Sequence, residues 1–130
     1  MERVSFDDLE NHPRVADVQK HATEPLNLSD MALNYYELEP GDSFSGGLHT
    51  HMNQEEVFLV MEGTATFQTR DEEVEVGADE VVRFAPGEYQ EGRNDGDEAV
   101  GAVALGAPQD AGETGSALPC EECGADYHVV

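Results

Sequence analysis

The chain has 130 residues, which is enough for one domain with one hydrophobic core and too few for two. Its 29 acidic residues outnumber six basic ones, and the resulting net charge of −23 disfavours binding to nucleic-acid phosphates. No stretch has the length of an apolar membrane span, and the N-terminus lacks the apolar region of a signal peptide. We therefore expect a cytoplasmic protein that has no membrane partner.

The acidic residues are spread along the whole chain rather than massed in a tail. Self-repulsion from such a charge is screened at high ionic strength, to a length of about 3 Å in molar salt. We interpret the composition as halophilic, that is, as adaptation to a salty cytoplasm. An acidic surface for a basic partner is the alternative.

Residues 1–30 are predicted to form an N-terminal extension. Ser5 precedes Phe6-Asp7-Asp8-Leu9 and fits the N-cap of a short helical turn, because acidic residues are favourable in a first turn. His12 and His21 lie in polar surroundings, and we interpret both as surface histidines.

Residues 31–107 are predicted to form an all-β domain. Gly, Pro, Asn and Asp, which favour turns, separate short runs rich in Val, Phe, Tyr and Thr. Many short strands without helical periodicity indicate a sandwich or barrel. The predicted strands are 32–38, 55–61, 64–69, 73–76, 80–84 and 99–105.

A candidate metal site lies just before and at the start of the second of these runs. On a strand, residues two apart share a face, so His49 and His51 point the same way. The four residues after His51 allow a turn that returns Glu56 on the neighbouring strand. Two imidazoles and a carboxylate with open positions suit Fe, Mn, Ni, Cu or Zn better than Ca. The alternative is an exposed histidine pair at a strand edge, with Glu56 as a solvated charge.

The spacing of these residues resembles the first motif of the cupin family, G-x5-H-x-H-x3/4-E-x6-G. His49-x-His51-x4-Glu56-x6-Gly63 matches its second half, whereas seven residues rather than five separate Gly41 from His49. The resemblance extends over about residues 31–107. It implies a cupin jelly-roll barrel, also called a double-stranded β-helix.

The run 79–94 resembles the second cupin motif, G-x5-P-x-G-x2-H-x3-N. Gly87 and Asn94 are in place, but Asp79 stands where the first glycine is expected and Pro86 is shifted by one position. The match is therefore partial.

Gln90 occupies the position of the family's third histidine ligand. An amide oxygen is a weaker donor than imidazole, so a site of His49, His51, Glu56 and Gln90 would hold a metal less tightly. Gln90 is either a fourth ligand or a hydrogen-bonding neighbour of the other three. The alternative hypothesis is a degenerate cupin that binds no metal.

Strand alternation puts Phe58 and Val60 on the face of Glu56. The opposite face is also apolar, so one face would line the barrel and the other would pack on a second layer or subunit, which makes a homodimer the expected assembly. That opposite face carries Val57, Leu59 and Met61. The candidate aromatic pocket walls are Tyr35, Tyr36, Phe44, Phe84 and Tyr89.

Residues 108–130 are predicted to be a flexible C-terminal tail, because the stretch from Gly106 to Leu118 has too little apolar surface to pack. Cys120 and Cys123 form a C-x-x-C pair near its end, followed by His128. Such a pair fits half of a zinc knuckle, a redox pair or two inert thiols. We favour a vestigial or intermolecular zinc site.

The predicted function is a metal-binding cupin that binds or acts on a small oxygen-rich molecule. Oxygenase, isomerase and lyase reactions all occur on this fold, and no catalytic base is identifiable from the sequence. The second hypothesis is a non-catalytic module that senses a small molecule or a metal through a degenerate site.

Overall fold

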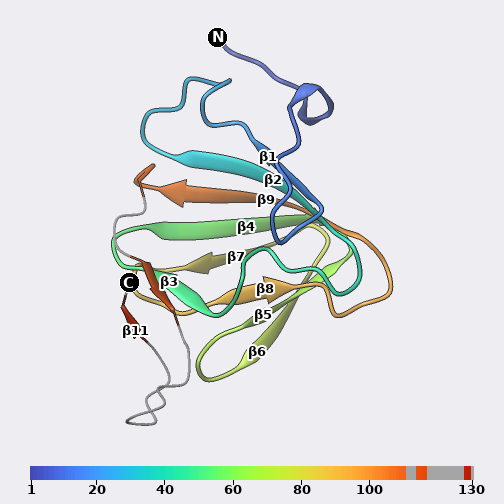
Figure 1. Ribbon diagram of the computed structural model, residues 1–130, viewed down its shortest axis with the longest axis vertical. Coiled ribbons are helices and arrows are strands. Elements are labelled where there is room, and N and C mark those ends of the chain that lie inside the picture. The colour runs from blue at the N-terminus through green and yellow to red at the C-terminus, as the bar shows by residue number, and fades with distance from the viewer. Residues whose placement is uncertain (111–113, 117–127, 130) are drawn as a thin grey trace.

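The computed structural model describes residues 1–110, 114–116 and 128–129. The elements are almost all strands, which confirms the all-β prediction (Figure 1). No helix in the described ranges is long and apolar enough to cross a membrane. In chain order the elements are a 3₁₀ turn η1 (Phe6–Asp8), β1 (Val18–His21), β2 (Ala32–Leu38), β3 (His49–His51), β4 (Glu55–Glu62), β5 (Thr64–Gln68), β6 (Glu73–Gly77), β7 (Glu80–Phe84), β8 (Glu91–Arg93), β9 (Val100–Ala107), β10 (Thr114–Ser116) and β11 (His128–Val129).

One layer is a five-stranded antiparallel sheet in the order β1-β2-β9-β4-β7. Its centre is the pair β4 and β9, whose register places Glu56 opposite Gly106 and Phe58 opposite Ala104. The small residues Gly106 and Ala104 of β9 therefore leave space beside the inward-facing side chains of Glu56 and Phe58 on β4.

The other layer consists of two three-stranded sheets, β11-β10-β3 and β6-β5-β8. A bridge between His49 and Gln90 joins β3 to the residue before β8, so the two pieces continue each other. Two antiparallel layers joined in this way form the predicted jelly roll (Figure 1).

The core between the layers is aromatic at its centre. Phe58 packs against Phe44 and Phe67 with ring centroids 4.9 and 5.0 Å apart. Gly92 of β8 lies against the same rings, and a Cβ there would come within 2.5 Å of Phe44 and 2.6 Å of Phe67. A glycine is therefore required for β8 to approach this cluster.

The inward and outward faces of β4 follow the predicted alternation. Phe58 and Val60 are 3% and 0% exposed and belong to the core, together with Phe84 of β7. On the outer face, Leu59 lies between Val103 of β9 and Val81 of β7. This outer face is apolar, and the homodimer stays a prediction.

The N-terminal segment is more than the predicted extension. Ser5 caps η1, as expected, by accepting a hydrogen bond from the Asp7 amide at 3.3 Å. However, β1 pairs with β2 along its whole length, so the sheet begins before residue 31. The sequence prediction missed β1 because Val18–His21 is short and largely polar.

Within the predicted C-terminal tail, residues 114–116 form a short strand, β10. β10 pairs with β3, with Thr114 opposite His51 and Ser116 opposite His49. Backbone hydrogen bonds hold this strand, and they leave no apolar signal in the sequence. Cys120 and Cys123 lie outside the described residues, and His128 begins β11.

Candidate metal centre

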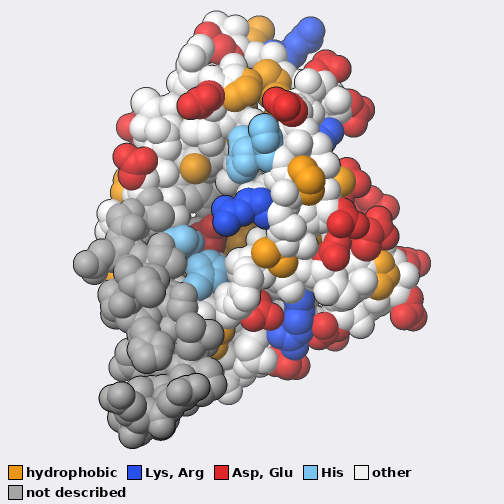
Figure 2. All heavy atoms as spheres, viewed as in Figure 1, with side chains coloured by type: hydrophobic (Ala, Val, Ile, Leu, Met, Phe, Trp, Pro, Cys, Tyr) orange, Lys and Arg blue, Asp and Glu red, His pale blue; other side chains and the backbone are white. Residues whose placement is uncertain are grey.

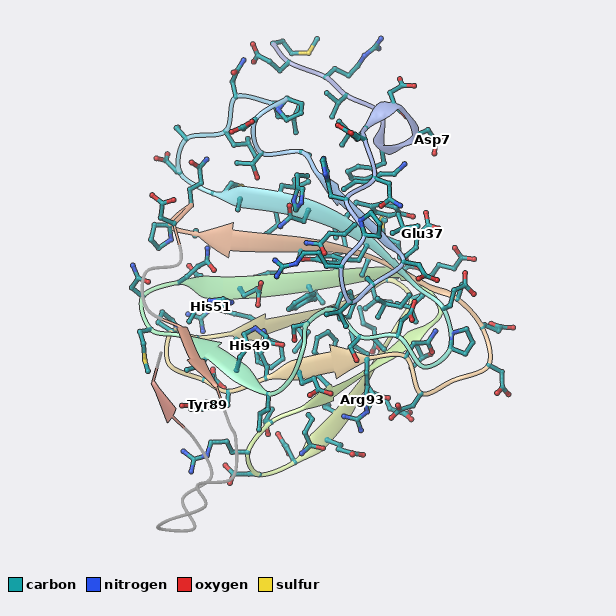
Figure 3. All side chains as sticks on the ribbon, in the orientation of Figure 1. Asp7, Glu37, His49, His51, Tyr89 and Arg93 are labelled. Atoms are coloured by element: carbon teal, nitrogen blue, oxygen red, sulfur yellow. The ribbon has the colours of Figure 1, made fainter. Side chains whose placement is uncertain are left out.

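The site begins with the alternation of side chains along β3. His49 and His51 point to one side, with ring centroids 5.0 Å apart, whereas Thr50 between them is buried on the other side (Figure 3). Glu56 follows near the start of β4. One ligand atom from each of His49, His51 and Glu56 lies within 4.8 Å of the others, a group that could hold a metal ion.

Backbone hydrogen bonds fix β3 against the segment that leads into β8. The His49 amide donates to the Gln90 carbonyl at 3.1 Å, and the Gln90 amide donates back at 2.8 Å. The Gly87 amide donates to the His51 carbonyl at 2.9 Å. This ladder sets the spacing between the two histidines and Gln90.

The tautomer of His49 follows from its neighbours. Its Nδ1 lies 2.9 Å from the carbonyl oxygen of Gly47, which can only accept, so Nδ1 carries the proton. The Ser45 hydroxyl lies 3.3 Å from the same nitrogen. The lone pair of His49 is therefore on Nε2, and a backbone carbonyl on the opposite nitrogen is a common support for a metal-binding imidazole.

His51 has no such support within the described part of the chain. Its Nδ1 is buried and has no hydrogen-bond partner there. Burial lowers the pKa of His51, and the neighbouring His49 lowers it further. The imidazole is therefore held in the neutral form that binds metals.

Glu56 is the carboxyl group of the site. Burial raises its pKa to about 7, because an ionised carboxylate loses its hydration inside the barrel. A bound cation would compensate that loss.

Gln90 lies among these groups, 3% exposed. Its Nε2 donates a 2.6 Å hydrogen bond to Glu56 Oε1 and lies 3.4 Å from His49 Nε2. The amide therefore faces the two atoms that would otherwise be free to bind a metal.

A pocket of about 260 Å³ opens above these side chains. Tyr36 and Phe44 line it, as two of the predicted aromatic walls, and Phe58 lines it as well. Burial and the nearby Glu56 raise the pKa of Tyr36 to about 12, and Arg14 opposes this shift. The phenol of Tyr36 thus stays protonated and can donate a hydrogen bond.

The other aromatic candidates do not line this pocket. Phe84 is part of the core, and Tyr89 is buried elsewhere. Tyr35 points away from the pocket and stacks on Phe6, with ring centroids 4.6 Å apart.

The sequence interpretation missed three pocket residues that come from the N-terminal segment, Arg14, Val15 and Gln19. Only the rarity of basic residues in this chain could have drawn attention to Arg14. Gln19 has no distinguishing sequence signal. It is buried, and its Nε2 lies 3.4 Å from the Tyr36 hydroxyl.

The residues present fit a divalent transition metal. Two imidazoles and one carboxyl group converge, and a buried imidazole nitrogen lacks a partner among the described groups. Such a donor set leaves positions open for a small molecule. The proposed zinc ligands Cys120 and Cys123 lie outside the described residues.

Comparison with known proteins identifies one family. A sequence model of the cupin domain matches residues 34–106, more than half of the chain. No curated protein sequence matches.

Solved structures share the fold at low sequence identity. The polyketide cyclase RemF from Streptomyces resistomycificus is 21% identical with a TM-score of 0.76, over 94% of this chain and 89% of that chain. A sugar phosphate isomerase of the cupin superfamily from Silicibacter pomeroyi is 18% identical with a TM-score of 0.72, over 98% and 91%. A predicted oxalate decarboxylase from Thermotoga maritima is 20% identical with a TM-score of 0.70, over 82% and 98%.

Proposed function

This chain belongs to the cupin family, and on that premise we propose that its barrel holds one divalent transition-metal ion and binds a small oxygen-rich molecule beside it. His49, His51 and Glu56 would be the protein ligands. The observation that carries the proposal is the convergence of their donor atoms within 4.8 Å at a pocket.

Gln90 would act through the other ligands. If His49 Nε2 and Glu56 Oε1 held a metal, the Gln90 amide would have to turn or withdraw from them. It would then either present its oxygen to the ion or support the second oxygen of Glu56.

A divalent ion in this position would supply Lewis-acid polarisation of an oxygen atom on the bound molecule. The chain's own groups would orient that molecule. The Tyr36 phenol, protonated because its pKa is about 12, would donate a hydrogen bond to it. Phe44 and Phe58 would exclude water from one side of the pocket.

The three similar proteins named above carry the names of a cyclase, an isomerase and a decarboxylase. One fold thus serves different reactions, and the reaction of this chain has to be inferred from its own site. The described pocket supports binding of a small molecule at a metal and leaves the reaction open.

A non-catalytic binding module is the second candidate, and Gln90 favours it. Its amide donates to Glu56 at 2.6 Å and lies 3.4 Å from His49 Nε2, so both groups have a polar neighbour without a metal. Oxygen uptake that requires Fe(II) and disappears in His49→Ala would support an oxygenase instead. A bound, redox-inert ion without such activity would support the binding module.

The test of the metal proposal is elemental mass spectrometry on untagged protein purified without chelator. Wild type should carry close to one metal ion per chain, and His51→Ala should lose it. His12→Ala is the matched control, because His12 is exposed and lies outside the pocket.

A Cys120→Ser/Cys123→Ser variant separates a metal in the C-terminal segment from one in the barrel. It should keep the barrel ion and lose only metal bound by the thiols. Wild type without metal, even after reconstitution with Fe(II), Mn(II), Ni(II), Cu(II) and Zn(II), would refute the proposal.

A further inference from the structure

Arg14 lines the same pocket as His49, His51 and Glu56, and it is the only cationic side chain among the pocket-lining residues. Figure 2 shows basic, histidine and acidic side chains together at the hollow in the middle of this face. The pocket thus has a metal-ligand group and a guanidinium group around one space.

The loop that carries Arg14 is held firmly. Ala16 is 1% exposed and belongs to the core. The Asn11 side chain accepts from the Gln19 amide at 2.9 Å and donates to the Asp17 carbonyl at 3.0 Å. The loop that carries Arg14 is thus clamped at its base by Asn11 and anchored by Ala16, which keeps the backbone of Arg14 beside the pocket.

Arg14 forms no salt bridge within the described part of the chain, although the chain has 29 acidic residues. Arg83 pairs with Glu55 at 2.7 Å, and Arg93 pairs with Glu73 at 2.7 Å. A guanidinium that has no carboxylate partner among the described residues is available to a ligand there.

The net negative charge of the molecule would make Arg14 a selective site for anions. A molecule of net charge −23 repels anions over most of its surface. In the pocket, however, a bound divalent ion and Arg14 would together outweigh the single carboxylate of Glu56. The pocket would then be a local positive site and would retain an anion that the rest of the surface repels.

We propose that Arg14 binds the carboxylate of a small organic acid whose neighbouring hydroxyl or keto oxygen faces the metal. The inference rests on the proposed metal site and adds the substrate class, a 2-hydroxy or 2-oxo acid. A carboxylate matches the planar fork of a guanidinium with two parallel hydrogen bonds.

The volume of the pocket, about 260 Å³, suits an acid of a few carbon atoms, because drug-sized ligands occupy pockets of about 300–1,000 Å³. A phosphate is disfavoured. Phosphates are usually held by several cations or by the backbone N–H groups of a helix N-terminus, and this pocket has one arginine and no helix.

The experiment is titration calorimetry with lactate, propane-1,2-diol and inorganic phosphate, in low-chloride buffer. The diol has the lactate skeleton with an uncharged group in place of the carboxylate. Each probe is titrated into metal-loaded and metal-free forms of wild type, Arg14→Gln, Arg14→Lys and Arg3→Gln. Arg3→Gln removes the same charge from a residue outside this pocket.

Wild type should bind lactate at least tenfold more tightly than the diol. Arg14→Gln should lose at least tenfold in lactate affinity, Arg14→Lys should lose less, and Arg3→Gln should match wild type. Metal content should be the same in all four proteins, because Arg14 is not a metal ligand.

Equal lactate affinity in wild type and Arg14→Gln, absence of lactate binding, or tighter binding of phosphate would overturn the inference. Failure of the metal proposal is a separate result, since it appears as absent metal in wild type. In that case the metal-free titrations still decide whether lactate affinity depends on Arg14.

Discussion

Gln90 Nε2 lies 2.6 Å from Glu56 Oε1, so the amide at the position of the family's third histidine is bonded to the carboxyl group of the same site. The same nitrogen lies 3.4 Å from His49 Nε2. An amide N–H group therefore occupies the lone pairs that a metal would use. Metal binding has to break these contacts, which weakens it relative to a site with a third imidazole.

Replacing Gln90 with histidine should strengthen metal binding. Gln90→His removes the competing N–H groups and supplies an additional imidazole from the same backbone position, which the bridge to His49 fixes. We expect the affinity for Zn(II) to rise at least tenfold, measured by competition with a chromophoric chelator. Gln90→Ala is the control, because it removes the amide without adding a ligand.

An affinity for Gln90→His that equals that of Gln90→Ala would show that position 90 does not face the ion. It would then contradict the proposed role of Gln90.

The histidines and Glu56 were predictable because their arrangement depends on local geometry. A spacing of two on a strand and a return after a turn are properties of the sequence itself. Gln90 was placed by its motif position. Its hydrogen bond to Glu56 was not predictable, because the orientation of the side-chain amide depends on packing in three dimensions.

Arg14 and β10 could not be inferred in the same way. Arg14 reaches the pocket because Ala16, two residues further along, packs in the core against residues that are distant in the sequence. β10 is held by backbone pairing to β3, which requires no particular side chains. The apolar strands from Ala32 to Phe84 were predicted within one or two residues, because their composition carries the signal.

Asn94 is expected to be a stability residue rather than a site residue, although it matches the second cupin motif. It is 1% exposed, and its Nδ2 donates to the carbonyl oxygens of Leu38 and Glu98 at 3.0 and 2.7 Å. Asn94→Ala leaves the buried Leu38 carbonyl and the partly buried Glu98 carbonyl without their donor. The free energy of unfolding should fall by about 1–3 kcal/mol, measured by urea denaturation.

The control for Asn94→Ala is Asn53→Ala, which changes an exposed asparagine and should be close to neutral. Equal stability of the two variants would show that the Asn94 network does not stabilise the loop between β8 and β9.

Salt should stabilise this protein. Acidic side chains gather along the right side of the visible face, with few basic ones between them (Figure 2). Screening their repulsion favours the folded state, so the melting temperature should rise by more than about 5 °C between 0.1 and 2 M KCl. Scanning calorimetry measures this directly.

A variant with fewer charges on the β5–β6 hairpin provides the comparison. Asp71→Asn, Glu72→Gln and Glu75→Gln neutralise three exposed acids, so the combined variant should melt higher than wild type at 0.1 M KCl and respond less to added salt. A melting temperature that does not change with KCl would contradict the interpretation of the charge as halophilic.

The most direct test of the metal site is anomalous X-ray diffraction from crystals grown with Zn(II). The account predicts one strong anomalous peak at about 2.0–2.2 Å from a nitrogen of His49, a nitrogen of His51 and an oxygen of Glu56. A map without a peak among these three residues, or with a peak only at Cys120 and Cys123, would contradict it.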